Sequence, residues 1–152
     1  EIHRYLRKIS GPLLDRIDIQ VEVQRPKYKK IASKEKVESS AEIQERVNKA
    51  RQLQLVRYKN YQIHSNAEIT TKMITEFCHL DNKSEELLQN AFIKFRLSVR
   101  AYEKILKVAR TIADLDEKEN IEVKHIAEAI QYRFLDKFSL KEEVQRYGTN
   151  FN

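Results

Sequence analysis

The scarcity of glycine limits what this chain of 152 residues can fold into. It holds only two glycines, Gly11 and Gly148, and two prolines. Turns that need a residue with positive φ are therefore few, which disfavours an all-β fold and favours long helices. The same scarcity leaves no room for a glycine-rich phosphate loop that ends in Lys-Ser or Lys-Thr. We therefore predict a mainly α-helical fold that lacks the phosphate loop of a nucleotide site.

The composition is that of a globular protein with a highly charged surface. Hydrophobic residues make up 41% of the chain and charged residues 34%, with a net charge of +6. This charge is compatible with an anionic partner, such as nucleic acid, nucleotide or an acidic protein face, but on composition alone a well-solvated surface is the preferred interpretation. The sequence holds no apolar run of about 20 residues and no signal peptide. With a single cysteine, Cys78, it predicts a cytoplasmic protein.

Apolar side chains recur at helical spacing from Ser39 onwards. Ser39-Ser40-Ala41-Glu42 matches a capping box, and the helix after it carries an apolar stripe at Ile43, Val47, Ala50, Leu53 and Val56. A short helix is predicted to end near Leu80, Asp81 and Ser98 are predicted to cap two further helices, and a last helix carries Val123, Ile126, Ala127 and Ile130. We predict a bundle of four or five helices, with Phe134, Leu135 and Phe138 folding back onto the last helix.

The region before the bundle has a different pattern. Ile17, Ile19, Val21 and Val23 alternate with polar residues, which predicts a half-buried strand whose sheet partners lie outside this sequence. Residues 24–38 are basic and predict a flexible linker. We therefore divide the chain into the end of a core domain (1–23), a basic linker (24–38), a helical domain (39–140) and a mobile tail (141–152). The start on Glu1, inside a predicted helix, indicates a piece of a longer protein.

Arg100 is the first candidate for a functional side chain. If Ser98 caps its helix, Arg100 lies in the first turn, where the helix dipole disfavours a cation by about 0.3–1 kcal/mol. The same helix end offers free N–H groups to an anion, so an arginine there suits a site visited by phosphate. The alternative is an exposed arginine with a small energetic penalty.

Two other arginines have structural alternatives of their own. Arg16, at the start of the predicted strand, could project to a neighbouring subunit and stabilise charge on a transferred phosphoryl group, or could pair with Asp15 or Asp18 in a turn. Arg110 is predicted to pair with Asp114 at i+4 on the solvent face of its helix.

The remaining reactive side chains favour structural roles. The four histidines lack the spacing of a zinc site, and His125 is expected near the core boundary. We expect Cys78 to be a small core residue rather than a nucleophile. Packing is also expected for five aromatic residues on core stripes: Phe77, Phe92, Phe95, Tyr102 and Tyr132. In the linker, Arg25, Lys27, Lys29 and Lys30 are the candidates for contact with nucleic-acid phosphates, against a simple solvated tether.

Several strings in the chain resemble those of a known family. They are GPLLDRID (11–18), LSVRAY (97–102), RTIADL (110–115) and HIAEAIQYR (125–133), together with the start of the helical domain around Ser39, Arg46 and Gln54. In this order they are similar to the C-terminal region of the magnesium-chelatase-like AAA+ ATPases of the YifB/ComM type. The resemblance covers roughly residues 2–135 and implies the AAA+ helical lid, preceded by the last helix and strand of the AAA+ core.

This resemblance implies roles that the residues alone leave open. Arg16 matches the arginine finger, which reaches the nucleotide of the adjacent subunit, and Arg100 matches the sensor-2 arginine, which contacts the γ-phosphate from the lid. The parent protein would be a bacterial ATPase that uses ATP and Mg²⁺ and assembles into a homo-oligomeric ring, with a hexamer expected. ComM-type members are linked to DNA branch migration in natural transformation.

Two alternatives remain open at this stage. The parent could be the ATPase subunit of a metal-chelatase-type complex, or the chain could be a free-standing helical module that binds nucleic acid or protein. In any of these cases we expect no enzymatic activity and no bound cofactor in this chain alone, since the phosphate loop and its magnesium ligands are missing from it.

Overall fold

The computed structural model of the chain describes residues 13, 16–21, 23, 25 and 38–133. The described part is mainly helical, as predicted. In chain order its elements are α4 (Ser40–Arg57), the 3₁₀ helix η1 (Asn66–Glu68), α5 (Thr71–Phe77), α6 (Asn82–Lys94), α7 (Val99–Leu115) and α8 (Val123–Gln131). None of the described helices is both long enough and apolar enough to cross a membrane.

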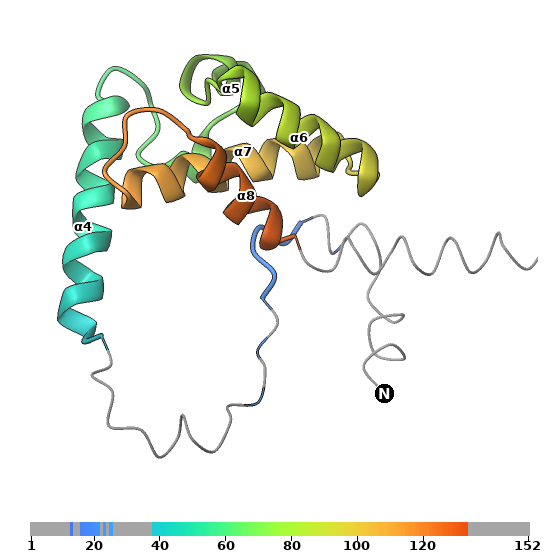
Figure 1. Ribbon diagram of the computed structural model, residues 1–152. Coiled ribbons are helices and arrows are strands. Elements are labelled where there is room, and N and C mark those ends of the chain that lie inside the picture. Colours follow the sequence, from blue (N-terminus) through green and yellow to red (C-terminus); the bar gives the residue numbers. More distant parts are fainter. Residues whose placement is uncertain (1–12, 14–15, 22, 24, 26–37, 134–152) are drawn as a thin grey trace, which may run out of the picture.

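Helix α7 is the central element of the bundle. It packs against α8, α4, α5 and η1, while α6 packs against α8. Helix α4 stands across the C-terminal part of α7, and the half of α4 that begins at Ser40 extends away from the other helices (Figure 1). α7 is therefore the helix to which most other elements are fixed.

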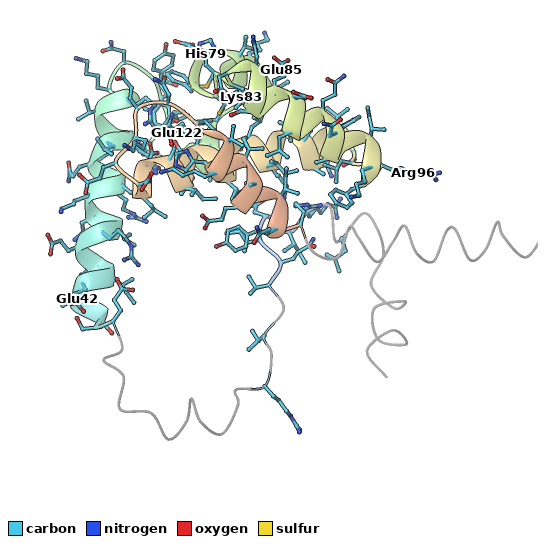
Figure 2. The ribbon with its side chains drawn as sticks, in the orientation of Figure 1. Glu42, His79, Lys83, Glu85, Arg96 and Glu122 are labelled. Atoms are coloured by element: carbon cyan, nitrogen blue, oxygen red, sulfur yellow. The ribbon has the colours of Figure 1, made fainter. Side chains whose placement is uncertain are left out.

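The predicted N-caps are confirmed. The Ser39 hydroxyl accepts the amide of Glu42, whose carboxylate in turn accepts the Ser39 amide at 2.7 Å, at the outer end of α4 (Figure 2). The Asp81 carboxylate caps α6, and the Ser98 hydroxyl caps α7 by accepting the Ala101 amide at 3.1 Å. These side chains satisfy amides that have no partner within the helix, and thereby set where each helix begins.

Two helices end in left-handed residues that are not glycine. Arg96 follows α6 with φ 44°, and its side chain points away from the bundle (Figure 2). Glu117 follows α7 with φ 55°. The Lys118 amide donates to the Ala113 carbonyl at 2.8 Å and the Glu117 amide to the Asp114 carbonyl at 3.1 Å, which is the Schellman arrangement that glycine usually completes. With so little glycine in the chain, both turns use residues that carry a Cβ.

The apolar core lies between α7 and the helices packed on it. Its buried members include Ile105, Leu106 and Ala109 of α7, Leu88 of α6 and Ile126 of α8. Phe77, Phe92, Phe95 and Tyr102 pack against this core, as predicted. The Phe77 ring and the buried Tyr58 ring form a T-shaped pair with a centroid distance of 5.0 Å. Cys78 and His125 are also buried.

A buried carboxylate joins α4 to α7. Asp114 is fully buried, and its two oxygens accept from Arg57 Nη1 at 2.9 Å and Nη2 at 2.5 Å. Asn66 in η1 donates to the same carboxylate at 2.8 Å and accepts from the Tyr58 hydroxyl at 2.7 Å. Burial lowers the pKa of Arg57, but the hydrogen bonds and charge of Asp114 outweigh this and raise its pKa above the usual value.

The predicted position of Arg110 on the solvent face is wrong. Arg110 does pair with Asp114 at 3.1 Å, but its side chain is only 3% exposed. Its guanidinium also donates to the carbonyls of Lys118 and Glu119, both at 2.6 Å, and so holds the loop after α7. Burial lowers the pKa of Arg110 below its usual value, although the negative charge of Asp114 acts in the opposite direction. These three acceptors compensate the buried cation, which i+4 spacing alone could not reveal.

The apolar stripe predicted on α4 is largely exposed in the described part of the chain. Only Ala50 of that stripe is buried, together with the polar Gln54, whereas Val56 is 68% exposed. The Gln54 side chain accepts the amide of Asn66 at 3.1 Å. The polar contacts of α4 therefore run from Arg57 to Asp114 of α7 and from Gln54 to Asn66 of η1, while most of its apolar stripe stays exposed.

The predicted half-buried strand is also wrong in the residues that the structure describes. Ile17, Ile19, Val21 and Val23 are exposed, and the buried residue of this segment is Gln20. Instead of a strand there is one isolated parallel bridge between Gln20 and Arg133, so the segment does have a downstream partner. Its backbone groups bond to Lys104 of α7 and to Tyr132 and Arg133, which follow α8, so in the described residues no extended sheet covers one face of the segment.

One further prediction differs from the structure, and another concerns residues outside the described part of the chain. The short helix predicted to end near Leu80 ends at Phe77, and Leu80 instead forms an isolated bridge with Ile121. Phe134, Leu135, Phe138 and the tail 141–152 lie outside the described part of the chain.

Replacing Glu117 by glycine is expected to stabilise the protein. In the left-handed conformation, steric strain from a Cβ costs about 1–2 kcal/mol of folding free energy. Glycine avoids this strain, but ordering its more flexible backbone costs about 0.5–1 kcal/mol. We expect E117G to raise the free energy of unfolding of the whole chain by about 0.5–1 kcal/mol in urea titrations. E117A is the matched control, because alanine keeps the Cβ; equal stabilisation by both variants would show that the backbone conformation is not the cause.

Replacing Asp114 by asparagine is expected to be strongly destabilising. The substitution keeps the side-chain shape but leaves the buried guanidinium of Arg110 and the partly buried one of Arg57 without their anion, which costs about 3–5 kcal/mol. E45Q, which removes the exposed ion pair of Glu45 with Lys49 at 3.4 Å, is expected to cost less than about 0.5 kcal/mol. Urea titrations of both variants would test this, and a loss below about 1 kcal/mol for D114N would contradict the role given to the carboxylate.

Candidate functional site

The N-terminal end of α7 carries the first candidate side chain. Arg100 occupies the first turn after the Ser98 cap and is exposed, as is its neighbour Val99. The aligned peptide dipoles place partial positive charge at this end, and Arg100 adds a full positive charge beside it. No acidic side chain lies in the first turn of this helix. The arrangement therefore favours an anion, and phosphate suits a guanidinium together with helix amides.

Arg16 lies in a short turn that contacts the same helix. Its amide donates to the Leu13 carbonyl at 3.0 Å, and its side chain is exposed. Its carbonyl accepts from Lys104 Nζ at 2.5 Å. Lys104 follows Arg100 by four residues, so both side chains lie on one face of α7. The fold thus brings the two candidate arginines to the same half of one helix.

The suggested ion pair between Arg16 and Asp18 is not the one that forms in the described residues. Asp18 pairs with Lys104, which bonds the Arg16 carbonyl as well. Lys104 was missed in the sequence because nothing local marks it: its two partners lie 86 and 88 positions away along the chain. Asp15 lies outside the described residues.

Arg133 is the second functional candidate that sequence reasoning missed. It is 2% exposed and donates from Nη1 to the Ile17 carbonyl at 2.6 Å. Beside it, the Tyr132 carbonyl accepts the Gln20 amide at 2.7 Å. Three backbone groups of residues 16–20 are therefore held by side-chain or backbone groups of α7 and of the end of α8.

The linker candidates can be placed only in part. Arg25 is exposed, and Lys27, Lys29 and Lys30 lie outside the described residues. Within the part of the chain that the structure describes, no three His, Cys, Asp or Glu side chains are grouped so that they could hold a metal ion.

His125 and Cys78 have structural surroundings. His125 Nδ1 accepts the Glu122 amide at 2.9 Å and its Nε2 lies 3.2 Å from Asp116 Oδ2, so the ring caps the start of α8. Cys78 is buried in the core, and burial raises the pKa of its thiol to about 11. At neutral pH this thiol is protonated and shielded, which fits a packing role and not a nucleophile.

Comparison with known proteins now adds to this geometry. Residues 37–133 match the family model of the magnesium chelatase subunit ChlI C-terminal domain, and residues 1–31 match that of magnesium chelatase subunit ChlI. The chain is 42% identical over 134 residues to the competence protein ComM of Haemophilus influenzae and 41% identical over 136 residues to YifB of Escherichia coli, an uncharacterized protein. Each match covers 88% of this chain but 26% of the relative, so the chain spans about a quarter of these proteins.

The surroundings of Cys78 give a prediction about thiol reactivity. At pH 8 the native thiol is both protonated and buried, so we expect Ellman's reagent to label it at least about a hundredfold more slowly than in 8 M urea. Absorbance of the released thionitrobenzoate measures both rates. Raising the pH from 7 to 9 is expected to leave most of the native thiol protonated, since its pKa is about 11. Rapid native labelling at pH 7 would contradict the packing role.

Proposed function

The chain belongs to the family of the magnesium chelatase subunit ChlI C-terminal domain, and from this membership we propose that it forms the helical lid of a ring-forming AAA+ ATPase. The similarity to ComM and YifB supports the same assignment. In this proposal residues 1–23 end the ATPase core, 24–38 link it to the lid and 39–140 form the lid. ATP and Mg²⁺ act in a parent protein that joins this chain to a phosphate loop, in a homo-oligomeric ring such as a hexamer.

The observation that carries the proposal is the place of Arg100. It is exposed on the first capped turn of α7, where the helix dipole makes a bare cation unfavourable. A γ-phosphate bound there would remove that penalty and accept hydrogen bonds from the guanidinium. We propose that Arg100 is the sensor-2 arginine, which binds the γ-phosphate in the pocket of its own subunit.

Arg16 is proposed to act across the subunit interface. Its side chain is exposed while its backbone is held against α7, which suits a cation presented to another subunit. As an arginine finger it would stabilise charge on the phosphoryl group during transfer in the neighbouring pocket, a contribution of about 10³–10⁵ in rate.

DNA is the proposed substrate of the parent ATPase. The relative from H. influenzae is named a competence protein, and the chain here carries a net charge of +6. We propose remodelling of DNA, as in branch migration during natural transformation, with Arg25, Lys27, Lys29 and Lys30 available for phosphate contacts. The family description favours a second candidate, in which the parent is the ATPase subunit of a metal-chelatase-type complex.

Mixed rings can test the two arginine roles. R16A and R100A, each introduced into the parent protein, are expected to lower the rate of ATP hydrolysis by about a hundredfold or more. R16A subunits mixed with subunits disabled in the phosphate loop are expected to recover part of the activity, because the disabled subunit still offers an intact finger to an intact pocket. R100A subunits in the same mixture are expected to recover none, since every pocket is then defective. Phosphate release measures the rates.

An exposed lysine away from both arginines serves as the control. K72A, in α5, removes one surface charge and is expected to hydrolyse ATP at the unchanged rate. Equal recovery in the R16A and R100A mixtures would overturn the division into a finger acting in the neighbour and a sensor acting within the subunit. Full activity of R16A in uniform rings would overturn the finger itself.

A further inference from the structure

We propose that Lys104 is a positioning residue, which together with Arg133 clamps the arginine-finger segment onto the lid helix that carries Arg100. This inference rests on the proposed function, because it assigns to these contacts a part in placing Arg16. Residues 16–20 are called the finger segment below. The clamp consists of Lys104, Arg133 and the Tyr132 carbonyl.

Lys104 holds the finger segment at its start. Its Nζ bonds the Arg16 carbonyl at 2.5 Å and pairs with the Asp18 carboxylate. The lysine side chain is only 17% exposed, whereas the Asp18 side chain is 62% exposed. One ammonium group thus fixes the peptide plane that follows Arg16 and the side chain two residues later. Its three N–H donors can satisfy both acceptors at the same time.

Arg133 and Tyr132 hold the rest of the finger segment. The buried guanidinium of Arg133 donates to the Ile17 carbonyl at 2.6 Å, and the Gln20 amide donates to the Tyr132 carbonyl at 2.7 Å. Hydrogen bonds from a charged donor are about twice as strong as those between neutral groups. Two charged donors, from α7 and from the end of α8, therefore act on successive carbonyls, those of Arg16 and Ile17.

Apolar packing contributes little to this attachment. Ile19 is 52% exposed and Val21 64% exposed. A cavity of about 630 Å³ lies between this part of the chain and the helices α7 and α8, and Ile19, Val21, Val108 and Leu115 are among its lining residues. Because Ile19 and Val21 are each more than half exposed, we assign the attachment of the finger segment to the lid chiefly to the polar clamp.

The clamp gives a mechanical link between two nucleotide sites. Arg100 and Lys104 are one turn apart on α7, so a lid movement that brings Arg100 to the γ-phosphate of its own subunit also carries Lys104 and the finger segment. Arg16 then moves with respect to the neighbouring pocket. A displacement of about 1 Å at such a group can change a rate by about a hundredfold. We infer that the clamp couples nucleotide binding in one subunit to hydrolysis in the next.

The substitution K104M removes the ammonium group and keeps the apolar stem. In the parent ATPase we expect K104M to lower kcat by about tenfold to a hundredfold while KM for ATP changes less than about threefold, because the subunit's own pocket is intact. K104R, which can still donate to both acceptors, is expected to restore most of kcat. The double variant R16A/K104M is expected to be no slower than R16A alone, within about twofold.

Lys107 offers a matched control on the same helix. It lies three residues further along α7, lines the same cavity and donates from Nζ to a carbonyl, but to that of Ala67 at 3.3 Å and not to the finger segment. K107M is expected to leave kcat unchanged. In hydrogen exchange of the whole chain, K104M is expected to speed exchange in residues 16–21 by at least about tenfold and K107M is expected not to.

Mixed rings separate failure of this inference from failure of the proposed function. K104M subunits mixed with subunits disabled in the phosphate loop are expected to recover activity as R16A subunits do. No recovery, with K104M inactive in uniform rings, would show that Lys104 acts in its own pocket and would overturn the inference. Full activity of K104M beside an inactive R16A would also overturn it and leave the finger intact. Full activity of R16A would overturn the proposed function itself.

Discussion

The buried carboxylate of Asp114 is the interaction on which the rest of the fold depends. Its oxygens bind Arg57 of α4, Asn66 of η1 and Arg110 of α7, so one side chain joins three elements of the fold. The arrangement is stable because each of these cations and polar groups has several partners, and Arg110 also holds the loop that follows α7. If one of these partners were missing, a buried charge would remain unpaired, and its desolvation cost would exceed the contribution of a single apolar contact.

Helix α7 joins this structural centre to the functional surface. Its C-terminal half carries Arg110 and Asp114, which fix α4 and the following loop, and its N-terminal half carries Arg100 and Lys104, which face phosphate and the finger segment in our proposals. Since one helix spans both halves, an anion that binds Arg100 and shifts α7 would also shift the elements packed along α7. This placement supports a lid that responds to nucleotide as a unit rather than residue by residue.

Much of the fold and part of the candidate site could be predicted from the sequence. Caps at Ser39, Asp81 and Ser98 depend on side chains within three residues of the amides they satisfy, so local sequence determines where those helices begin. The same holds for Arg100, whose position in the first turn follows from the cap. Arg110 was misplaced and Lys104 was missed because their partners lie elsewhere in space. Burial of a charged residue depends on acceptors that the fold assembles, and i+4 spacing carries no information about them.

The sequence by itself determined the helical class, because two glycines cannot supply the turns of a sheet protein and the apolar periodicity of α6, α7 and α8 is strong. It also determined the family, through strings that remain recognisable without coordinates. Only the tertiary structure decided that the stripe of α4 stays exposed, that Gln20 and not Ile19 is buried, and that the finger segment meets α7. The physical reason is that alternation and periodicity report which residues can share a face, whereas contacts between distant segments decide which face is covered.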